Sequence, residues 1–578
     1  MTRRWWIGSA IVLAGIGLVA FGCGSMTSRS PAASTASESI TNNQEAGVDE
    51  GGIVKAWGDF LVVLRRGRLF TVRLADHDLA PVCMVDAFPP GSDLGTWYDE
   101  MLIHDRNVVV VGYSYQVGGT EIGLFELDSQ GCIRHVSTHF LHSNDYYSSR
   151  NYASRLVEGK LVFYMPHYLG SYRLEDGYIR TTATLPSVRR HGDRAWEPVI
   201  TMSDMHAPAP PSGTTALHTV VTCDLGQGDL DCTAQGIIGG FGRTFYVSPR
   251  AVYVWVHDGV HRDGQDEGAA PAAVYRLPLD GSAPGALAAW GVPTDQFSFK
   301  EDTDGNLNVL VRETGFGDSM GGPEASSGGV ALARIAGAAF ADRGLPAVDR
   351  ASYTALPAPS DGRAFQNRFV GDYVLYGTGT SWGYADRGAR ADLFVHAYAR
   401  QGEAAKLALP HGVDRIEAMG EDAVVIGTDG DSLHFTSIEL DGTPRAVDRF
   451  VRAEASQGEL RSHGFFFLPS GLGKGVLGLP VRSNRSAGFF HLYQGSAEVL
   501  YLSVDELRFA RLGALASRDD DVDDDCQVSC VDWYGNARPI FYRGRVFALL
   551  GYELVEGVVR RGRIVEVERT HLIADLRT

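Results

Sequence analysis

Residues 47–74 read GVDEGGIVKAWGDFLVVLRRGRLFTVRL, and this stretch indicates the fold. Three short runs rich in Val, Phe and Leu occupy residues 53–57, 60–64 and 69–74, and the breaks between them are a Gly-Asp pair and an Arg-Gly pair. Short β-forming runs with such tight breaks are typical of antiparallel strands joined by hairpin turns. The stretch therefore predicts an antiparallel meander.

The same pattern recurs along the rest of the chain. About eight units of four strands can be traced, each about 40 residues long before insertions, and further strands follow in residues 539–572. A four-stranded repeat of this length is typical of a β-propeller blade. We therefore expect an all-β fold, a β-propeller of seven or eight four-stranded blades over residues 47–578. Two stacked β-domains, divided near the Gly315–Gly328 loop, are the alternative.

A propeller also explains why the repeat must close on itself. A single four-stranded sheet cannot bury both of its faces, so each blade packs between two neighbours. An open ring would expose apolar faces and edge strands at its two ends. We therefore expect the segment after Arg538 to pack with the first unit, either completing a blade with the N-terminal strands or forming a partial blade beside them.

The N-terminus predicts export. Arg3 and Arg4 precede an apolar run over residues 5–22, an arrangement typical of a signal sequence. Residues 18–22, which end in a small residue directly before Cys23, resemble the lipobox of bacterial lipoproteins. That resemblance implies a signal peptide over residues 1–22 and acylation of Cys23. An uncleaved anchor helix is the alternative.

A flexible spacer is expected between this signal and the folded domain. Residues 23–46 are rich in Ser, Thr and Ala and contain few large apolar side chains, so they cannot form a core. Whether the anchor is a lipid on Cys23 or an uncleaved helix, the folded domain is expected to be extracytoplasmic and tethered to a membrane. The expected location is the cell envelope, at the outer membrane or the cell surface.

Charge and cysteine content narrow the class of protein further. The formal net charge is -18, and no basic cluster follows Arg4, which argues against a nucleic-acid partner. Setting Cys23 aside leaves an even number of cysteines, which in an exported protein suggests disulfides. Cys223 and Cys232 flank a hairpin-sized loop, and Cys526 and Cys530 would close a very small one. Cys83 and Cys132 then pair by elimination; buried free thiols are the alternative.

Three groups of motifs stand out along the chain. They are Thr41-Asn42-Asn43-Gln44, Gly47-Val48-Asp49-Glu50, Ile53-Val54-Lys55 and Gly58-Asp59, then Gln296-Phe297-Ser298-Phe299 with Asp304-Gly305-Asn306-Leu307, then Arg368-Phe369-Val370-Gly371-Asp372. They resemble the motifs of a family of secreted bacterial and archaeal proteins that carry a β-propeller domain distantly related to WD40 propellers, and they occur in the family's order over most of residues 41–572. One departure is the stretch SWGYADRGARADLF at residues 381–394, which replaces a Thr-x-x-Asp-Pro-Leu segment. The resemblance implies a propeller fold and an extracytoplasmic location, and it carries over no catalytic residue.

An acidic run at residues 519–525 is the candidate metal site. The alternating carboxylates of Asp519, Asp521, Asp523 and Asp525 resemble the oxygen-rich loops that bind calcium. The run lacks the glycine and the terminal glutamate of an EF-hand, and so many like charges also extend a loop that binds no metal. A solvated loop is therefore the preferred interpretation, and calcium is the alternative cofactor.

Other motifs are weak. Residues 379–383 match GxSxG, but no helix is expected after the serine, as a hydrolase nucleophile would need. Residues 473–478 match GxGxxG within a strand pattern, so nucleotide binding is not expected. His135, His139 and His142 lie in an extended segment, where residues four apart are separated by more than about 10 Å. A structural role is expected for them.

These observations together predict a membrane-tethered, extracytoplasmic β-propeller that binds an envelope or extracellular protein or glycan. Four long loops could form its binding surface, because binding residues concentrate on loops held by a rigid scaffold. An enzyme, a hydrolase or lyase acting on a glycan or peptide in the propeller channel, is the first alternative. A purely structural envelope protein is the second. The four loops are residues 189–213, 315–328, 378–391 and 518–533.

Overall fold

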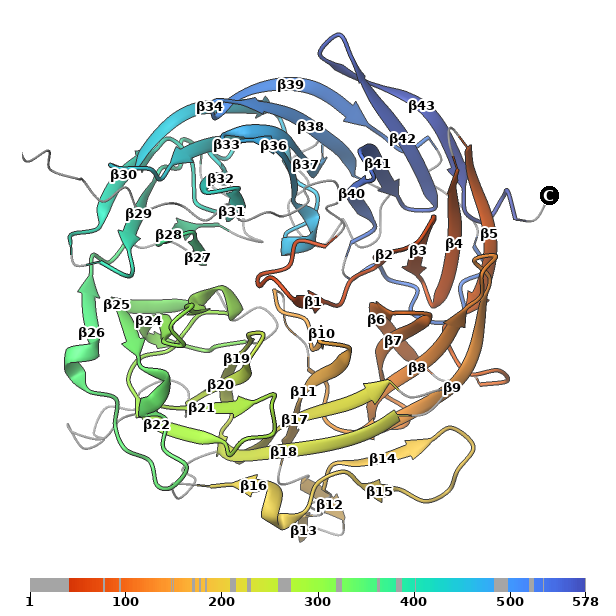
Figure 1. Ribbon diagram of the computed structural model, residues 1–578, viewed down its shortest axis with the longest axis vertical. Helices are drawn as coiled ribbons and strands as arrows, with labels where there is room; N and C mark the ends of the chain where they lie inside the picture. The colour runs from red at the N-terminus through yellow and green to blue at the C-terminus, as the bar shows by residue number, and fades with distance from the viewer. Residues whose placement is uncertain are drawn as a thin grey trace, which may run out of the picture. The chain divides into compact units, whose positions relative to one another are not determined.

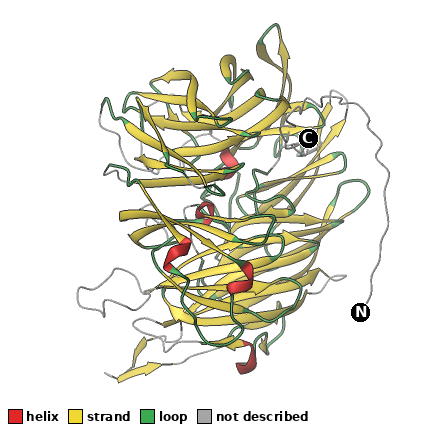
Figure 2. Cartoon of the chain, turned by 60° about the vertical axis from the view of Figure 1, so that its left-hand side comes forward, coloured by secondary structure: helices red, strands yellow, loops and turns green. Residues whose placement is uncertain are grey.

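The structure is a computed structural model of the full chain. All described residues belong to one compact unit, Ser37–Thr578. Almost all of their regular structure is strand, with a few single-turn helices (Figure 2). Within the described part of the chain no helix is long and apolar enough to cross a membrane. The predicted signal peptide and Cys23 lie outside it. The described residues are 41–75, 78–92, 95–146, 148, 150–168, 172–175, 178–181, 185–207, 215–225, 230–257, 272–318, 325–360, 364–380, 387–400, 402–482, 497–518, 524–533 and 535–576.

The strands form a ring of antiparallel blades in chain order (Figure 1). Blades 1 to 3 occupy the first part of the chain. Blade 1 consists of β2 (Val54–Trp57), β3 (Phe60–Arg65), β4 (Arg68–Ala75) and β5 (Asp78–Asp86). Blade 2 consists of β6 (Thr96–His104), β7 (Asn107–Ser114), β8 (Gly119–Leu127) and β9 (Ile133–His142). Blade 3 consists of β10 (Ser154–Val157), β11 (Lys160–Tyr168), β17 (Thr215–Leu225) and β18 (Leu230–Gly240).

Blades 4 to 6 follow the same plan. Blade 4 consists of β19 (Gly242–Val247), β20 (Ala251–His257), β21 (Ala272–Pro278) and β22 (Gly285–Ala289). Blade 5 consists of β23 (Phe299–Glu301), β24 (Leu307–Gly315), β25 (Ser326–Ile335) and β26 (Tyr353–Leu356). Blade 6 consists of β27 (Ala364–Val370), β28 (Tyr373–Gly379), β29 (Ala391–Ala397) and β30 (Ala405–Leu409).

Blades 7 to 9 complete the ring. Blade 7 consists of β31 (Arg415–Met419), β32 (Asp422–Thr428), β33 (Ser432–Glu439) and β34 (Arg445–Ala453). In blade 8 the inner position is shared by β35 (Ser456–Gln457) and β36 (Phe466–Gly471), followed by β37 (Lys474–Arg482), β38 (Glu498–Asp505) and β39 (Arg508–Leu515). Blade 9 consists of β40 (Ala537–Tyr542), β41 (Arg545–Leu550), β42 (Glu553–Arg560) and β43 (Arg563–His571).

Short elements are added to this ring. Strand β1 (Val48–Glu50) pairs with the inner strand of blade 3, and the chain between β11 and β17 extends the outer edges of blades 2 and 3. That chain forms the hairpin β12 (Tyr172–Glu175) and β13 (Tyr178–Thr181), then β14 (Ser187–Arg190), β15 (Glu197–Pro198) and β16 (Met205–His206). The 3-10 helices are η1 (Met202–Asp204), η2 (Gln296–Ser298), η3 (Gly337–Ala339), η4 (Arg350–Ser352) and η5 (Ser462–Gly464).

The described strands form nine blades, which corrects the expectation of seven or eight. The C-terminal strands β40–β43 make a complete four-stranded blade rather than a partial one. The N-terminal strand contributes nothing to it, because β1 pairs with β10 in blade 3. No break divides blade 5 into two domains, since β24 and β25 pair across the Gly315–Gly328 segment.

Blade 9 packs directly on blade 1, as predicted. Leu61 and Val63 of blade 1 share one buried apolar cluster with Ile540, Leu549 and Leu554 of blade 9. Full burial of such a side chain stabilises the fold by about 1.5–3 kcal/mol. Blades 1 and 9 are both complete four-stranded sheets. The ring is therefore closed by apolar packing between its first and last blades rather than by a blade assembled from both ends of the chain.

Residues 41–52 run through the centre of the ring, beside the inner strands (Figure 1). The Asn42 amide donates to the Glu417 carboxylate of blade 7 at 3.0 Å. On the other side, the Gln44 amide donates at 2.9 Å to the carbonyl oxygen of Gln296, just before blade 5. The flexible spacer therefore does not extend to residue 46, because its last residues are bonded to several blades.

Candidate functional site

The topology determines the side of the ring from which each loop leaves its blade. Successive strands of a blade run in opposite directions, so the turn between its second and third strands lies on the same side as the connection to the next blade. We call this side the loop face. Residues 189–213, 315–328 and 378–391 lie between second and third strands, and residues 518–533 connect blades 8 and 9. The four predicted loops therefore leave their blades on this face, and the first of them continues along the outer edges of blades 2 and 3 through β14 and β16.

Aromatic side chains are exposed on this face. Among the described residues the exposed large aromatic side chains are Tyr115, Phe241 and Phe316, with exposed fractions of 62%, 39% and 52%. The first follows β7, the second connects blades 3 and 4, and the third follows β24, so all three lie on the loop face. The ring of Tyr113 lies 4.9 Å from that of Tyr115, and Tyr168 stacks on Phe241 at 5.1 Å. We call these five residues the aromatic patch.

Backbone contacts fix the patch to the blades. Gly317, next to Phe316, pairs with Arg243, which lies two residues after Phe241. The amide of Asp318 donates to the Arg243 carbonyl oxygen at 2.6 Å. Gly317 has a φ of +68°, and a Cβ at this position would overlap the Arg243 carbonyl oxygen. Glycine is therefore required for the close approach that joins the β24–β25 loop to blade 4.

A buried carboxylate supports the patch from below. Asp318 is fully buried, and its side chain accepts hydrogen bonds from Asn151 at 3.2 Å and from Ser148 at 3.5 Å. Burial raises the pKa of the Asp318 carboxyl to about 7, although the bond from Asn151 favours the charged form. These bonds tie the β24–β25 loop of blade 5 to the connection between blades 2 and 3.

Polar groups accompany the aromatic rings. The Tyr115 hydroxyl donates to the Asp145 carboxylate at 2.6 Å, and burial raises the pKa of this carboxyl. The Arg243 guanidinium lies 5.3 Å from the Phe241 ring centre and 5.8 Å from that of Tyr146, within cation–π range. The exposed rings are therefore accompanied by the half-buried Asp145 carboxylate, and the Arg243 guanidinium beside them is buried.

The centre of the ring contains a second polar cluster, formed by buried ion pairs. The Glu417 carboxylate accepts from Arg368 and from Arg415, both at 2.8 Å. Glu459 pairs with Arg538 at 3.1 Å. All of these side chains are at least nine-tenths buried. Each carboxylate is therefore neutralised by arginines from inner strands.

The N-terminal segment adds one more carboxylate to this cluster. Glu50 lies 4.0 Å from the Arg155 guanidinium and accepts from His463 at 3.2 Å. Burial alone would raise the pKa of Glu50, but Arg155 and His463 together lower it to about 2. Glu50 is therefore a charged group that joins the N-terminal segment to blades 3 and 8.

The family is shown by comparison with known proteins. The family model described as the beta propeller domain matches residues 38–331, which is more than half of the chain. The chain belongs to the beta propeller domain family. No curated protein matches it.

Solved structures resemble this beta propeller only distantly. A candidate dipeptidyl aminopeptidase IV from Bacteroides ovatus is 10% identical, with a TM-score of 0.26, and the match covers 75% of this chain and 65% of that one. The tricorn protease is 9% identical, with a TM-score of 0.18, and the match covers 91% of this chain and 63% of that one. This chain thus spans less than two thirds of both proteins. Neither similarity is high enough to support an argument about function.

One or two residues from each of the three groups of motifs that resemble the family meet in the central cluster of this beta propeller. Gln44 bonds to Gln296, Asn42 bonds to Glu417, and Arg368 pairs with the same Glu417 carboxylate. The family resemblance therefore rests on residues that hold the N-terminal segment inside the ring. The aromatic patch lies outside these motifs.

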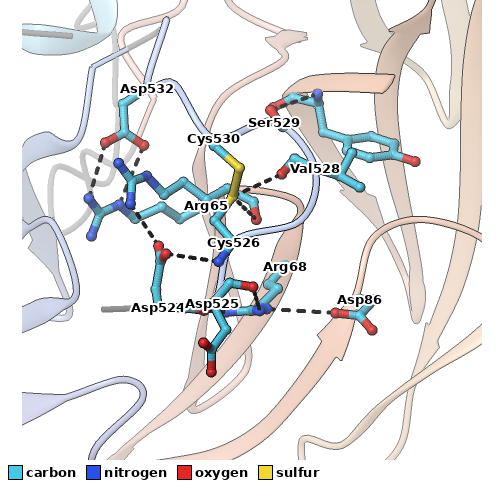
Figure 3. The surroundings of a disulfide bond; sticks show 12 residues. Arg65, Arg68, Asp86, Asp524, Asp525, Cys526, Val528, Ser529, Cys530 and Asp532 are labelled. Carbon is cyan, nitrogen blue, oxygen red and sulfur yellow. Dashed lines mark hydrogen bonds and ion pairs between the residues drawn. A yellow bond between two sulfur atoms is a disulfide. The ribbon is translucent and has the colours of Figure 1, made fainter. Parts of the chain in front are cut away.

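The acidic loop between blades 8 and 9 contacts blades 1 and 2, next to the point where the ring closes (Figure 3). Asp532 pairs with Arg65 of blade 1 at 3.1 Å, and Asp524 pairs with Arg66 at 2.8 Å. The Ser529 hydroxyl accepts from the Tyr98 amide of blade 2 at 3.1 Å. The loop thus reaches past blade 9 to blades 1 and 2. We call residues 524–533 the clasp.

The predicted calcium site lies mostly outside the described residues. Asp519, Asp521 and Asp523 are not among them. Asp525 is described, and its carbonyl oxygen accepts from Arg68 at 3.1 Å. Within the described part of the chain no group of His, Cys, Asp and Glu side chains could hold a metal ion. Calcium binding remains a prediction.

Two of the three predicted cysteine pairs are disulfides in the structure. Cys223 and Cys232 are bonded across β17 and β18, and Cys526 and Cys530 are bonded inside the clasp. Cys83 and Cys132 are free thiols.

The remaining motifs do not form a site among the described residues. Gly379 ends β28, whereas Ser381 of the GxSxG match lies outside the described residues. The GxGxxG match forms a turn and the start of β37 and opens no helix. His135 bonds to Thr138 and His139 bonds to Ser137, while the His142 ring contacts His167. The three predicted histidines therefore make separate structural contacts.

Proposed function

We propose that this beta propeller is an extracytoplasmic, membrane-tethered module that binds an envelope or extracellular partner through the aromatic patch. The observation that carries the proposal is the position of the exposed rings Tyr115, Phe241 and Phe316, which all lie on the loop face within blades 2 to 5. The export signal and the lipid at Cys23 that we expect from the sequence would place this face outside the cytoplasm.

Physical reasons support binding at the patch. Exposed apolar area on a soluble surface often marks an interaction site. Aromatic side chains are enriched among the residues that carry binding energy, and Tyr115, Phe241 and Phe316 are all exposed. The rings are pre-organised, since bonds at Gly317 and Asp145 hold them to neighbouring blades, and pre-organisation reduces the entropic cost of binding.

Site-specific photo-crosslinking tests the proposal. A benzophenone amino acid at Tyr115 reports contacts of the loop face, and the same group at Leu472 is the matched control. Leu472 is 76% exposed and lies in the turn between β36 and β37, on the opposite face. We expect one stoichiometric product from Tyr115 in intact cells and none from Leu472. Equal products from both positions, or none from either, would contradict binding at the patch and favour a purely structural protein.

An enzyme acting on a glycan or peptide is the second candidate. It is favoured by Asp99 and Glu100, adjacent carboxyls at a bulge in β6 whose pKa values burial raises, to about 7 for Asp99. Against it, the N-terminal segment occupies the centre of the ring and Glu417 is paired with arginines. Turnover of envelope glycans or peptides that Asp99→Asn abolishes, with binding retained, would establish the enzyme.

A further inference from the structure

The two free thiols lie at the interface between blades 1 and 2. Cys83 is in β5, the outermost strand of blade 1, and Cys132 comes directly before β9 in blade 2. Both side chains are half-buried, so small reagents and other thiols can reach them. Among the described residues these are the cysteines outside a disulfide.

Packing holds the two cysteines next to each other. The turn that carries Cys132 docks on blade 1, because a Cβ on Gly131 would overlap the Phe60 ring. Ile133, the next residue, shares one apolar cluster with Val85, two residues after Cys83. The neighbouring Cys83 thiol and burial together raise the pKa of Cys132 to about 11. The proximity of the two cysteines is therefore set by the packing of β5 in blade 1 against β9 in blade 2.

The other cysteines indicate an environment in which this pair would oxidise. Cys223–Cys232 and Cys526–Cys530 are both bonded. Disulfides form and persist outside the cytoplasm and are rare within it. Two neighbouring thiols on packed strands in such an environment can become a disulfide when their Cα atoms come within the usual range for a bridge.

We propose that Cys83 and Cys132 form a third disulfide, which links blades 1 and 2. The thiolate of one cysteine attacks the disulfide of an oxidised dithiol carrier, and one carrier sulfur leaves as a thiolate. The second cysteine then attacks the mixed disulfide and displaces the other carrier sulfur. The Cys83–Cys132 bond forms, the carrier bond is broken, and two electrons and two protons pass from the protein to the carrier.

This bond would reinforce the part of the ring next to its closure. The clasp holds blade 1 from one side through Arg65 and Arg66, and Ser529 reaches blade 2. The Cys83–Cys132 bond would connect blades 1 and 2 directly at their outer strands. Blade 1, where the ring closes, would then be joined to its neighbours by packing, ion pairs and a covalent bond.

Peptide mapping of the exported, full-length protein tests the proposal. The protein is taken from membranes without reductant, alkylated under denaturing conditions and digested. We expect a linked peptide that contains Cys83 and Cys132, lighter by two hydrogen atoms than the sum of its reduced halves. Full alkylation of both cysteines would overturn the proposal. A link from either one to Cys223, Cys232, Cys526 or Cys530 would also overturn it.

Single variants provide the control. In Cys83→Ser the Cys132 thiol should become fully alkylated, and in Cys132→Ser the Cys83 thiol should become fully alkylated. The other two disulfides should stay intact in both variants. We also expect mild reduction of the wild type to lower its Tm by a few degrees more than the same treatment of the double serine variant. Equal shifts in the two proteins would contradict a stabilising link.

Discussion

The substitution Glu50→Gln tests how the N-terminal segment is held inside the ring. It keeps the shape of the side chain and removes the charge that faces Arg155 and His463. The surroundings lower the pKa of Glu50 from 4.5 to about 2. Such a shift corresponds to about 3 kcal/mol of stability at pH 7. We expect Glu50→Gln to reduce the free energy of unfolding by that order of magnitude.

The direction of the pKa shift determines how the stability contribution of Glu50 depends on pH. The folded-state pKa is depressed, so the contribution of Glu50 is fully present above the unfolded-state pKa of 4.5 and is lost as the pH falls through about 2. The difference in stability between wild type and Glu50→Gln should therefore be constant from pH 7 to pH 5. It should shrink as the pH is lowered further.

Urea unfolding of both proteins at pH 7, 5 and 3 measures this difference. Glu439→Gln is the matched control, because Glu439 pairs with Arg445 on the surface and is 31% exposed. An exposed ion pair of this kind contributes about 0–1 kcal/mol. A loss in Glu50→Gln no larger than in the control, or a loss that does not change with pH, would refute the reasoning.

Further expectations concern the clasp, the patch and calcium. Asp532→Ala should lower the free energy of unfolding by about 2 kcal/mol, because it leaves the largely buried Arg65 guanidinium without its partner. Thermal melting measures the loss, with Asp505→Ala as the exposed control. Equal Tm values for the two variants would contradict the role of the clasp. Gly317→Ala should strain the approach to Arg243 and cost about 1–3 kcal/mol, more than Gly344→Ala, which has a similar φ of +74° and open space for a Cβ. Differential scanning calorimetry measures both losses of stability. A larger loss for Gly344→Ala than for Gly317→Ala would contradict the close approach. Calcium at millimolar concentration should leave the Tm unchanged if residues 519–525 form a solvated loop, and an upward shift that Asp521→Asn removes would establish the metal site instead.

The strands could be predicted from sequence because their signals are local. The runs 60–64 and 69–74 lie within β3 and β4, and the Arg66-Gly67 turn between them is where the sequence indicates it. The number of blades could not be counted in this way. From the sequence we expect residues 539–572 to complete a blade with the N-terminal strands or to form a partial one, but β40–β43 form a complete four-stranded sheet of their own and β1 pairs with β10 in blade 3.

The proposed binding surface was predictable only at the level of loops. The sequence indicates four long connections, and strand alternation makes them leave their blades on one face. The patch could not be recognised, because Tyr115, Phe241 and Phe316 are isolated in sequence, and only the fold places them on the same face, with the bridge between Gly317 and Arg243 joining the segments of Phe316 and Phe241. The one local signal is the triplet Tyr113-Ser114-Tyr115 at the end of a strand, where rings at alternate positions point to the same side. The role of residues 41–46 was missed because their partners lie in blades far along the chain.

The affinity of the crosslinked partner tests the central claim most directly. Once photo-crosslinking has identified it, its Kd is measured for the wild type, for Phe316→Ser and for Leu472→Ser. Loss of one anchoring ring at a binding surface typically costs more than 1 kcal/mol, so we expect about a tenfold rise in Kd for Phe316→Ser. Leu472→Ser, on the opposite face, should bind as the wild type does. An unchanged Kd for Phe316→Ser, or an equal rise for both variants, would contradict binding through the aromatic patch.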